Sequence, residues 1–477
     1  MTRIAMVGAG FGGIAVAHLL RRAGFGDVTI YERAAEVGGV WRDNTYPGCA
    51  CDIPAPLYSY SFALNPDWSQ RFPPHDEILR YLRTCADDFG LRPHLRLGTA
   101  VAAAAWTGTA WRLTLADQAT GLRSTAEYDI LIPATGQLTR PVVPALPGAE
   151  DFAGLAVHTA AWDPAIDVTG RRVGVIGTGA SAVQLVPAIA DRAAAVTVFQ
   201  RSAPWTLPKP NRRYGRVRRA LNRRVPPLMR AARAGTWLLT VVTGRAMTGR
   251  PIARRFVRAL SDAQRLLQAR RLRPRVTPDY AMGCKRVLFT GDWYRTLRRA
   301  HVDLVTHDIV QVTSAGVRTA DGSAYDCDLL VYATGFAATE FLTPLAVTGR
   351  DGRRLDEEWR DGAYAHLGIT VPGFPNLFLM YGPNTNTGNT SVVYFHESQA
   401  RYIVQAVRAV AESGPLEVRA DVAAAFDAEM QRRLGGSVWT GCTSWYRTAT
   451  GRVVTNWPGM ASEYRARTAR LSRTDYR

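Results

Sequence analysis

Residues 4–13 of this chain read Ile-Ala-Met-Val-Gly-Ala-Gly-Phe-Gly-Gly, and this stretch decides the fold. Four apolar residues indicate a buried strand, and three glycines follow at the spacing Gly-x-Gly-x-x-Gly: Gly8, Gly10 and Gly13. A helical pattern over 14–23 and a second strand over 27–31 come next, and that strand ends at Glu32. This order of elements predicts a Rossmann-like unit, in which the glycines approach a pyrophosphate and the acid grips a ribose diol. A carboxylate would repel a 2′-phosphate, so this site favours FAD or NAD over NADP.

A second copy of the pattern lies farther along the chain. The apolar strand 173–176 leads into Gly177-Thr178-Gly179-Ala180-Ser181-Ala182, where alanine takes the place of the last glycine. This exchange is tolerated where the helix packs on the sheet. Gln200 occupies the position that Glu32 has in the first unit, and the residues after it are Arg201 and Ser202. Without the acid, and with a guanidinium beside the ribose, the second site favours NADP over NAD.

Length and composition are those of a folded protein with two or three domains. The chain has 477 residues, of which 47% are hydrophobic, so it can bury ample core. The first strand starts almost at the N-terminus, and no apolar run reaches membrane-spanning length, so we expect a cytoplasmic protein. The six cysteines form no Cys-x-x-Cys pair and lack the spacing of a zinc site. We therefore expect neither a disulfide framework nor a metal site. A redox pair of Cys49 and Cys51 stays open as an alternative.

The net charge of +19 comes from one segment. Between Lys209 and Arg275 there are 20 basic residues and a single acid, Asp262, and the rest of the chain is neutral. Only two lysines occur in the chain, and no aromatic–basic motif of nucleic-acid binding accompanies the arginines. We therefore expect a solvated helical face, with contact to a membrane surface or an acidic partner as the alternative.

A loop after Glu32, within the first unit, carries three short motifs, Gly38-Gly39-Val40-Trp41, Tyr46-Pro47-Gly48 and Asp52. The paired glycines permit close packing on a flat ligand, the tryptophan can lie along that ligand, and Tyr-Pro-Gly makes a rigid turn. Asp52 therefore ends a constrained loop, where a carboxylate could orient a cation or simply cap the turn.

The linker between the two units, residues 152–163, reads Phe-Ala-Gly-Leu-Ala-Val-His-Thr-Ala-Ala-Trp-Asp. Gly154 supplies backbone freedom and His158 supplies a group that titrates near neutral pH. Phe152 and Trp162 supply anchors at the two ends. Such a linker could let one nucleotide-binding unit shift relative to the other.

The second half of the chain adds a charged pair and further predicted elements. Lys285 stands beside Arg286 in a chain with almost no lysine, which hints at a required compact charge, although exposed loop charges are the alternative. The apolar run 236–242 is too short for a membrane span and indicates core or a helix contact. A buried strand is predicted over 376–381. A helix over 391–411 follows, and its N-terminus could stabilise negative charge on a reduced flavin.

The loop motifs and the linker together resemble the two signatures of the type I Baeyer–Villiger monooxygenases, and the resemblance covers essentially the whole chain. It implies that Arg286 is the active-site residue, that Asp52 orients it through a bidentate ion pair, and that Lys285 binds the NADP phosphate. One departure is Val287, where many relatives have proline. The linker fingerprint consists of Phe152, Gly154, His158, Trp162 and Asp163. The cofactor-binding residues implied are Gly8, Gly10, Gly13, Glu32, Gly39, Val40, Trp41, Asp52, Tyr58, Val101, Gly177, Thr178, Gly179, Ala180, Ser181, Arg201, Ser202, Lys285, Asn384 and Trp445.

The resemblance implies an α/β fold of two Rossmann-like domains, for FAD and NADPH, with the FAD domain discontinuous and a helical basic insert. The expected domains are residues 1–145 for the first part of the FAD domain, 146–332 for the NADPH domain with its Arg-rich helical segment 209–280, and 333–477 for the second FAD part with a C-terminal substrate-side segment. The implied reaction uses NADPH, FAD and O2 to turn a ketone into an ester or lactone through a flavin C4a-peroxide.

Three other functions stay open. The nearest is N- or S-oxygenation by a related flavin monooxygenase, and the others are a peroxide-releasing NADPH oxidase and a basic membrane-surface or binding protein. We expect a small-molecule ketone and O2 as partners, no nucleic acid and no transmembrane segment, with peripheral membrane contact open. The sequence leaves the ketone, its regiochemistry and the oligomeric state undetermined.

Overall fold

The computed structural model describes residues 2–247, 251–268, 272–388 and 390–477. Two parallel sheets dominate it, and the first is built from the strand that opens the chain. Its order is β3 (Leu95–Arg96), β2 (Val28–Tyr31), β1 (Ile4–Val7) and β7 (Ile130–Pro133), all parallel. Helix α1 (Phe11–Arg22) follows β1 directly, as the glycine spacing predicts, and buries its apolar face against α10 (Val392–Ser413).

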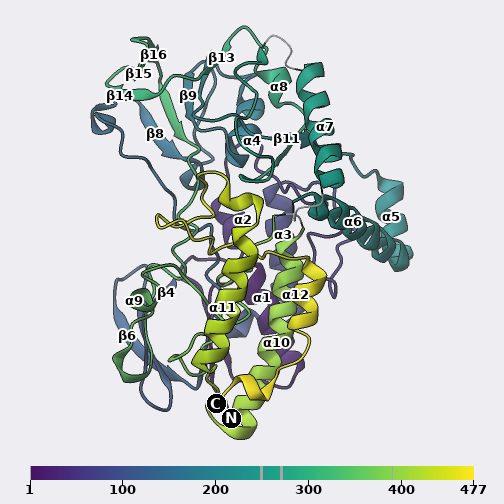
Figure 1. Ribbon diagram of the computed structural model, residues 1–477, viewed down its shortest axis with the longest axis vertical. Coiled ribbons are helices and arrows are strands. Elements are labelled where there is room, and N and C mark those ends of the chain that lie inside the picture. Colours follow the sequence, from purple (N-terminus) through teal and green to yellow (C-terminus); the bar gives the residue numbers. More distant parts are fainter. Residues whose placement is uncertain (1, 248–250, 269–271, 389) are drawn as a thin grey trace.

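The second parallel sheet has five strands and begins within the linker. Its order is β13 (Val302–Val305), β10 (Ala195–Phe199), β9 (Arg172–Ile176), β17 (Leu329–Tyr332) and β8 (Leu155–His158). Helix α4 (Ala180–Ile189) repeats the role of α1 after β9. Continuous apolar strands of this kind are expected in sheets that are covered on both faces. In Figure 1 this sheet fills the upper half of the molecule, and the purple N-terminal and yellow C-terminal segments share the lower half.

The two glycine turns have the same geometry. Gly8 and Gly177 have φ angles of +106° and +108°, which side-chain-bearing residues rarely adopt. A Cβ at either position would come within 2.6 Å of a carbonyl oxygen, that of Ala134 or that of Ala333. These two alanines open the repeated Ala-Thr-Gly sequences after β7 and β17. Each Ala-Thr-Gly therefore supports a glycine turn, which explains why the chain carries it twice.

Smaller sheets complete the structure. An antiparallel sheet of order β18 (Ala346–Thr348), β4 (Thr99–Trp106), β5 (Trp111–Asp117) and β6 (Arg123–Tyr128) is parallel only at its β18 edge. A meander of β14 (Ile309–Thr313), β15 (Gly316–Thr319) and β16 (Ala324–Asp326) and a pair of β11 (Thr206–Pro208) and β12 (Leu288–Thr290) flank the second sheet. Further α-helices are α2 (Val40–Asp43), α3 (His75–Asp88), α8 (Trp293–Thr296), α9 (Leu355–Glu358), α11 (Ala420–Gly435) and α12 (Ala461–Arg467).

The basic segment forms three helices, α5 (Arg216–Arg224), α6 (Pro226–Met247) and α7 (Pro251–Gln268). They project from the right-hand side of the molecule in Figure 1. The prediction that residues 236–242 are core or a helix contact is only partly right, because Thr240 is buried but Leu238 and Leu239 are 60% and 50% exposed. In the described part of the chain, no helix is long and apolar enough to cross a bilayer.

Two further predictions need correction. The strand predicted over 376–381 is reduced to one parallel bridge between Leu131 and Leu377, because positive φ angles at Asn376 and Tyr381 interrupt the extended backbone. The cysteine pattern also gave reason to expect no disulfide framework, yet one disulfide is present, between Cys284 and Cys442. Sequence spacing could not find this pair, because 158 residues separate the two cysteines.

Candidate active site

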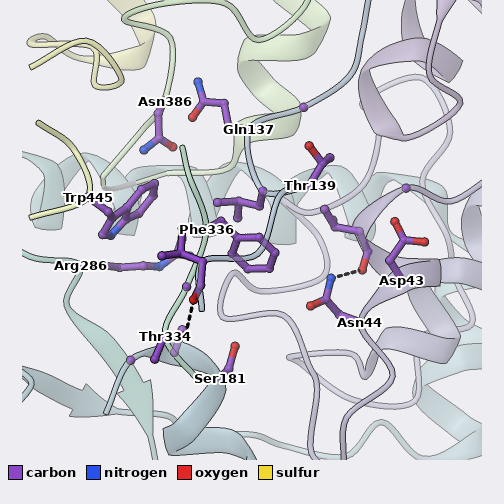
Figure 2. Close-up of a pocket in the computed structure, with 18 of the residues that line it drawn as sticks. Asp43, Asn44, Gln137, Thr139, Ser181, Arg286, Thr334, Phe336, Asn386 and Trp445 are labelled. Carbon is purple, nitrogen blue, oxygen red and sulfur yellow. Dashed lines mark hydrogen bonds between the residues drawn. The ribbon is translucent and has the colours of Figure 1, made fainter. Parts of the chain in front are cut away.

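One large cavity, of about 1200 Å³, lies between the two glycine turns. Residues of both turns line it, including Gly10 from the first and Gly179 from the second. Figure 2 shows side chains from distant parts of the chain entering this space, among them Ser181, Arg286 and Trp445. Among the described residues, no group of His, Cys, Asp and Glu is arranged to hold a metal ion. The cavity therefore extends from one nucleotide-binding unit to the other.

The first glycine turn is tied to its acid. Glu32 is 5% exposed and lines the cavity. One of its carboxylate oxygens accepts a hydrogen bond from the backbone N–H of Ala9 at 2.9 Å, and the other accepts one from Ala34 at 3.0 Å. Arg42 pairs with the same side chain at 3.1 Å. These bonds fix the carboxylate at the end of β2, where a dinucleotide ribose lies in such units.

The second turn carries positive charge instead. Lys285 Nζ donates to Ser202 Oγ at 2.7 Å, and Arg201 lines the same part of the cavity. Burial, and after it the nearby Arg201 guanidinium, lower the pKa of Lys285. Two cations that converge in this way repel each other until an anion binds between them. Gln200, in the acid position, donates from Nε2 to the carbonyl oxygen of Arg275 at 2.6 Å.

Asp52 and Arg286 form an ion pair inside the cavity. Arg286 donates from Nε at 3.1 Å and from Nη2 at 2.6 Å, and both bonds end on Asp52 Oδ2. The expected bidentate pair therefore uses one carboxylate oxygen rather than two. Burial raises the pKa of Asp52, but Arg286 and then Lys209 outweigh burial and leave that pKa lowered. Asp52 in turn raises the pKa of Arg286, so the guanidinium carries a fixed charge.

Lys209 is a residue that the sequence reading overlooked. It stands at the start of the basic segment, and its charge acts on Asp52 together with that of Arg286. Its Nζ lies 5.2 Å from the centre of the Phe72 ring, a cation–π contact. Its only sequence signal is the rarity of lysine in the chain, which singles out Lys209 and Lys285 equally.

The two motifs before Asp52 connect the units. Trp41 lines the cavity and donates from Nε1 to the hydroxyl of Tyr58 at 3.1 Å. The Tyr46 hydroxyl donates to Gln184 on α4 at 2.9 Å, so the Tyr-Pro-Gly turn docks on the second unit. A Cβ on Gly48 would come within 2.5 Å of the Gln184 carbonyl oxygen. This contact places Asp52 between the two units.

The linker fingerprint packs outside the cavity lining. His158 ends β8, is 6% exposed, and its Nδ1 accepts from the Ala160 backbone N–H at 3.1 Å. Burial lowers its pKa, so the ring is neutral at neutral pH. Trp162 is buried in the core of the second unit, and Asp163 accepts from the Ala165 N–H at 2.8 Å. The fingerprint therefore anchors the start of the second sheet.

The structure gives a reason for a glycine at position 154 that differs from the predicted backbone freedom. Its φ is ordinary, but a Cβ would come within 2.6 Å of the Phe152 ring and 2.7 Å of the Asp328 carbonyl oxygen. Gly154 is thus required for close packing of the linker on β17, not for backbone freedom. The two anchors of the fingerprint also lie in different cores, since Phe152 packs in the cluster around Tyr332 and Trp162 in the cluster of α4.

Most of the other implied cofactor residues line the cavity: Gly8, Gly10, Gly39, Val40, Val101, Gly177, Thr178, Gly179, Ala180, Ser181 and Trp445. Gly13 and Asn384 are not among the lining residues. A Cβ on Gly13 would come within 2.0 Å of the Gly8 carbonyl oxygen, so this glycine packs the helix on the turn. Asn384 donates instead to the carbonyl oxygens of Val453 and Asn456, both at 3.1 Å. These bonds hold the C-terminal segment.

Several lining residues have no motif that would reveal them. Phe336, Tyr381 and Asn386 face the cavity, and the Tyr381 hydroxyl donates to Asn386 at 2.7 Å. In Figure 2, Phe336 lies beside Arg286 and Trp445, while Asn386 and Gln137 lie together above them. The one signal for Phe336 is its place directly after the second Ala-Thr-Gly.

The long helix α10 begins at the cavity. Ser391 is its N-cap and its Oγ accepts from the Val393 N–H at 3.2 Å. Thr390 and Val392 line the cavity on either side of the cap, so the positive end of the helix faces it. Asn389, two residues before the N-cap, lies outside the described residues.

The alternative of a redox pair at Cys49 and Cys51 finds no support. Both side chains are buried and free. Burial raises the pKa of the Cys49 thiol to about 12, and that of Cys51 is raised as well. Both cysteines are therefore protonated thiols at neutral pH, which are poor nucleophiles.

Comparisons with known proteins agree with this geometry. The model of the flavin-binding monooxygenase-like family matches residues 1–250. A Baeyer–Villiger monooxygenase of Streptomyces coelicolor is 39% identical, with 99% of this chain and 92% of that protein covered, and one of Pseudomonas aeruginosa is 38% identical over 99% and 91%. An oxidized steroid monooxygenase bound to NADP matches with a TM-score of 0.85 and 31% identity over 98% of this chain and 97% of that one. An OTEMO complex with FAD and NADP matches with a TM-score of 0.88 and 27% identity over 100% and 99%.

Proposed function

The chain belongs to the Baeyer–Villiger monooxygenases of the flavin-binding monooxygenase-like family, and we propose that it uses NADPH, FAD and O2 to convert a ketone into an ester or lactone. The observation that carries this proposal is the Asp52–Arg286 ion pair in the cavity between two dinucleotide-binding turns. A fixed cation at this place serves a reaction in which an oxygen nucleophile attacks a carbonyl and negative charge builds up on oxygen.

The residues present fit both cofactors. The first turn offers the positive φ at Gly8 and the acid Glu32, which suit the pyrophosphate and the unphosphorylated ribose of FAD. The second turn lacks the acid and gathers Arg201 and Lys285, which suit the 2′-phosphate of NADPH. When bound, the two cofactors supply reducing equivalents and activate O2, while the protein supplies charge, placement and exclusion of water.

Arg286 provides the charge for the oxygen-insertion step. Its guanidinium is held on one side by Asp52, and 39% of its side chain remains accessible, towards the cavity that it lines. Because Asp52 keeps the guanidinium protonated and oriented, the cation needs no reorganisation when negative charge develops on the attacked carbonyl oxygen. Asp52 acts through Arg286 and is a positioning residue.

The remaining lining residues form the walls of the proposed substrate space. Trp445 comes from the C-terminal segment and Phe336 from the turn after β17, so the cavity near Arg286 has aromatic walls. Such walls bury an apolar ketone and keep water away from the reacting groups. The N-terminus of α10 adds a partial positive charge on the side of the first turn.

The experiment that tests this proposal uses the purified yellow protein. NADPH reduces it without air, oxygen is then admitted, and a panel of linear, cyclic and aromatic ketones is screened by mass spectrometry for products heavier by one oxygen. Thioethers and tertiary amines run in parallel. Ester or lactone from at least one ketone supports the proposal. Oxygenated thioethers or amines with every ketone unchanged, or NADPH consumed with hydrogen peroxide as the sole product, would refute it.

A further inference from the structure

The helices α5, α6 and α7, residues 216–268 and called the arm below, combine the charge excess of the chain with exposed apolar side chains. Of the fifteen large apolar side chains that are exposed in the described residues, ten lie on the arm. They are Val217, Leu221, Val225, Leu228, Leu238, Leu239, Phe256, Leu260, Leu266 and Leu267. Single exposed apolar residues are ordinary, but a concentration of this kind marks a surface that contacts something apolar.

With the exception of Val225, Leu238 and Leu266, the exposed apolar residues form lines along the helices. They are spaced by four residues on α5 (Val217 and Leu221), by eleven on α6 (Leu228 and Leu239), and by four and seven on α7 (Phe256, Leu260 and Leu267). At 100° per residue, these spacings keep the members of each line within about 40° of one another. Each helix therefore presents an apolar stripe to solvent. On α7 the stripe is centred about 80–160° around the helix from the buried Val257, Ser261 and Arg265 of the inner face.

Arginines without an ionic partner accompany the stripes. Arg216, Arg224, Arg230 and Arg255 are exposed and form no ion pair with any other residue that the structure describes. The arm carries one acid, Asp262, and this carboxylate is already shared by Arg258 and Arg265. Arg223 and Arg233 pair with Asp67 and Glu397 outside the arm, but the charge of the four arginines named above is not compensated by a described acid, and an anionic partner would complement it.

We propose that the arm docks the protein on the surface of an anionic lipid bilayer. A helix with one apolar stripe and an arginine-rich remainder is the pattern of helices that lie in the bilayer interface, with the apolar side chains among the acyl chains and the arginines at the headgroups. Leucine and phenylalanine at 42–82% exposure gain nothing from phosphate contacts alone, which disfavours a nucleic-acid partner. The contact is peripheral, since no described helix can cross the bilayer.

The direct test is flotation of the FAD-loaded protein with vesicles of phosphatidylcholine alone or with 30% phosphatidylglycerol. We expect flotation only with the anionic vesicles and weaker flotation as salt increases. Each basic residue near an anionic surface strengthens binding about fivefold, so the triple variant Arg216→Gln, Arg224→Gln, Arg230→Gln should weaken it by roughly 100-fold. The triple variant Val217→Ser, Phe256→Ser, Leu267→Ser should also abolish flotation at physiological salt.

Matched variants on other surfaces provide the control. Arg123, Arg318 and Arg360 are exposed arginines without a described ion pair, and their change to glutamine should leave flotation unchanged. Leu122 and Val310, which are 71% and 45% exposed, serve in the same way for the apolar variant. All variants should keep wild-type NADPH oxidation with a water-soluble ketone, because none of these residues lines the cavity.

Three results would overturn the proposal. The first is an absence of flotation with 30% phosphatidylglycerol at low salt. The second is equal loss of binding in the arm variants and their controls. The third is binding to duplex DNA or an acidic protein as strong as that to vesicles, with the serine variant unaffected, since the arm would then be a purely electrostatic polyanion site. Each of these outcomes is independent of whether ketones are oxygenated.

Discussion

The change Lys285→Gln should convert this enzyme from one that prefers NADPH to one that barely distinguishes NADPH from NADH. Glutamine keeps the length for a hydrogen bond to Ser202 but removes the charge that now lies 2.7 Å from Ser202 Oγ. A charge-assisted hydrogen bond contributes about 1.5–3 kcal/mol. Because Lys285 is only partly buried, we take the lower half of that range, which corresponds to a roughly 10- to 50-fold rise in KM for NADPH. NADH lacks the 2′-phosphate, so its KM should change by less than about twofold.

The assay is the initial rate of NADPH or NADH oxidation in the presence of O2 and a ketone, followed by absorbance, with the two nucleotides titrated separately for each variant. Arg201→Gln should shift the ratio of the NADPH and NADH KM values in the same direction. The shift in the double variant should be smaller than the product of the two single shifts, because both cations contact one phosphate. Arg255→Gln, an exposed arginine on α7, is the control and should change neither KM. An equal loss of NADPH and NADH affinity in Lys285→Gln would refute the reasoning, because the lysine would then hold the turn rather than the phosphate.

Three further outcomes follow from other parts of the structure. Asp52→Asn leaves Arg286 without its ionic partner, which should lower the free energy of unfolding by about 1–3 kcal/mol in urea titrations and reduce ester yield; unchanged yield would contradict the positioning role. Burial lowers the pKa of His366 and His396 to about 4, so the unfolded chain takes up protons below about pH 6.5 while the native chain does not. The free energy of unfolding should therefore fall as pH drops from 6.5 to 4, by about 3 kcal/mol per histidine. In the His366→Gln variant, the part of this decrease that comes from His366 should be absent. Reduction of the Cys284–Cys442 disulfide, or Cys442→Ser, should cost about 2–5 kcal/mol because the bond closes a long loop; identical unfolding with and without reductant would contradict this.

Local patterns predicted the nucleotide-binding units because each lies within one short stretch of chain. The spacing of Gly8, Gly10 and Gly13 dictates a strand, turn and helix whatever the rest of the chain does, and the structure places β1 and α1 there. The contrast of Glu32 with Gln200 needed only an alignment of the two units within the sequence. The Asp52–Arg286 contact spans 234 residues and was inferable only from the family resemblance.

The features that were predicted wrongly or missed depend on tertiary contacts, which the sequence does not reveal. The segment 376–381 has a strand-like composition, but positive φ angles at both ends limit it to one bridge beside β7. The packing reason for Gly154 depends on where the Asp328 carbonyl lies, and no spacing rule provides this. Lys209 and Asn386 belong to no motif, and their importance is visible only when the cavity is assembled.

The most direct test of the account is the product balance of Arg286→Ala. NADPH consumed, ester or lactone formed and hydrogen peroxide released are measured together, with a ketone that the wild-type protein oxygenates. We predict that flavin reduction by NADPH proceeds at close to the wild-type rate while ester formation falls by at least about 100-fold, with hydrogen peroxide accounting for the NADPH consumed. Ester formation at the wild-type ratio to NADPH would contradict the claim that this guanidinium supplies the charge for oxygen insertion.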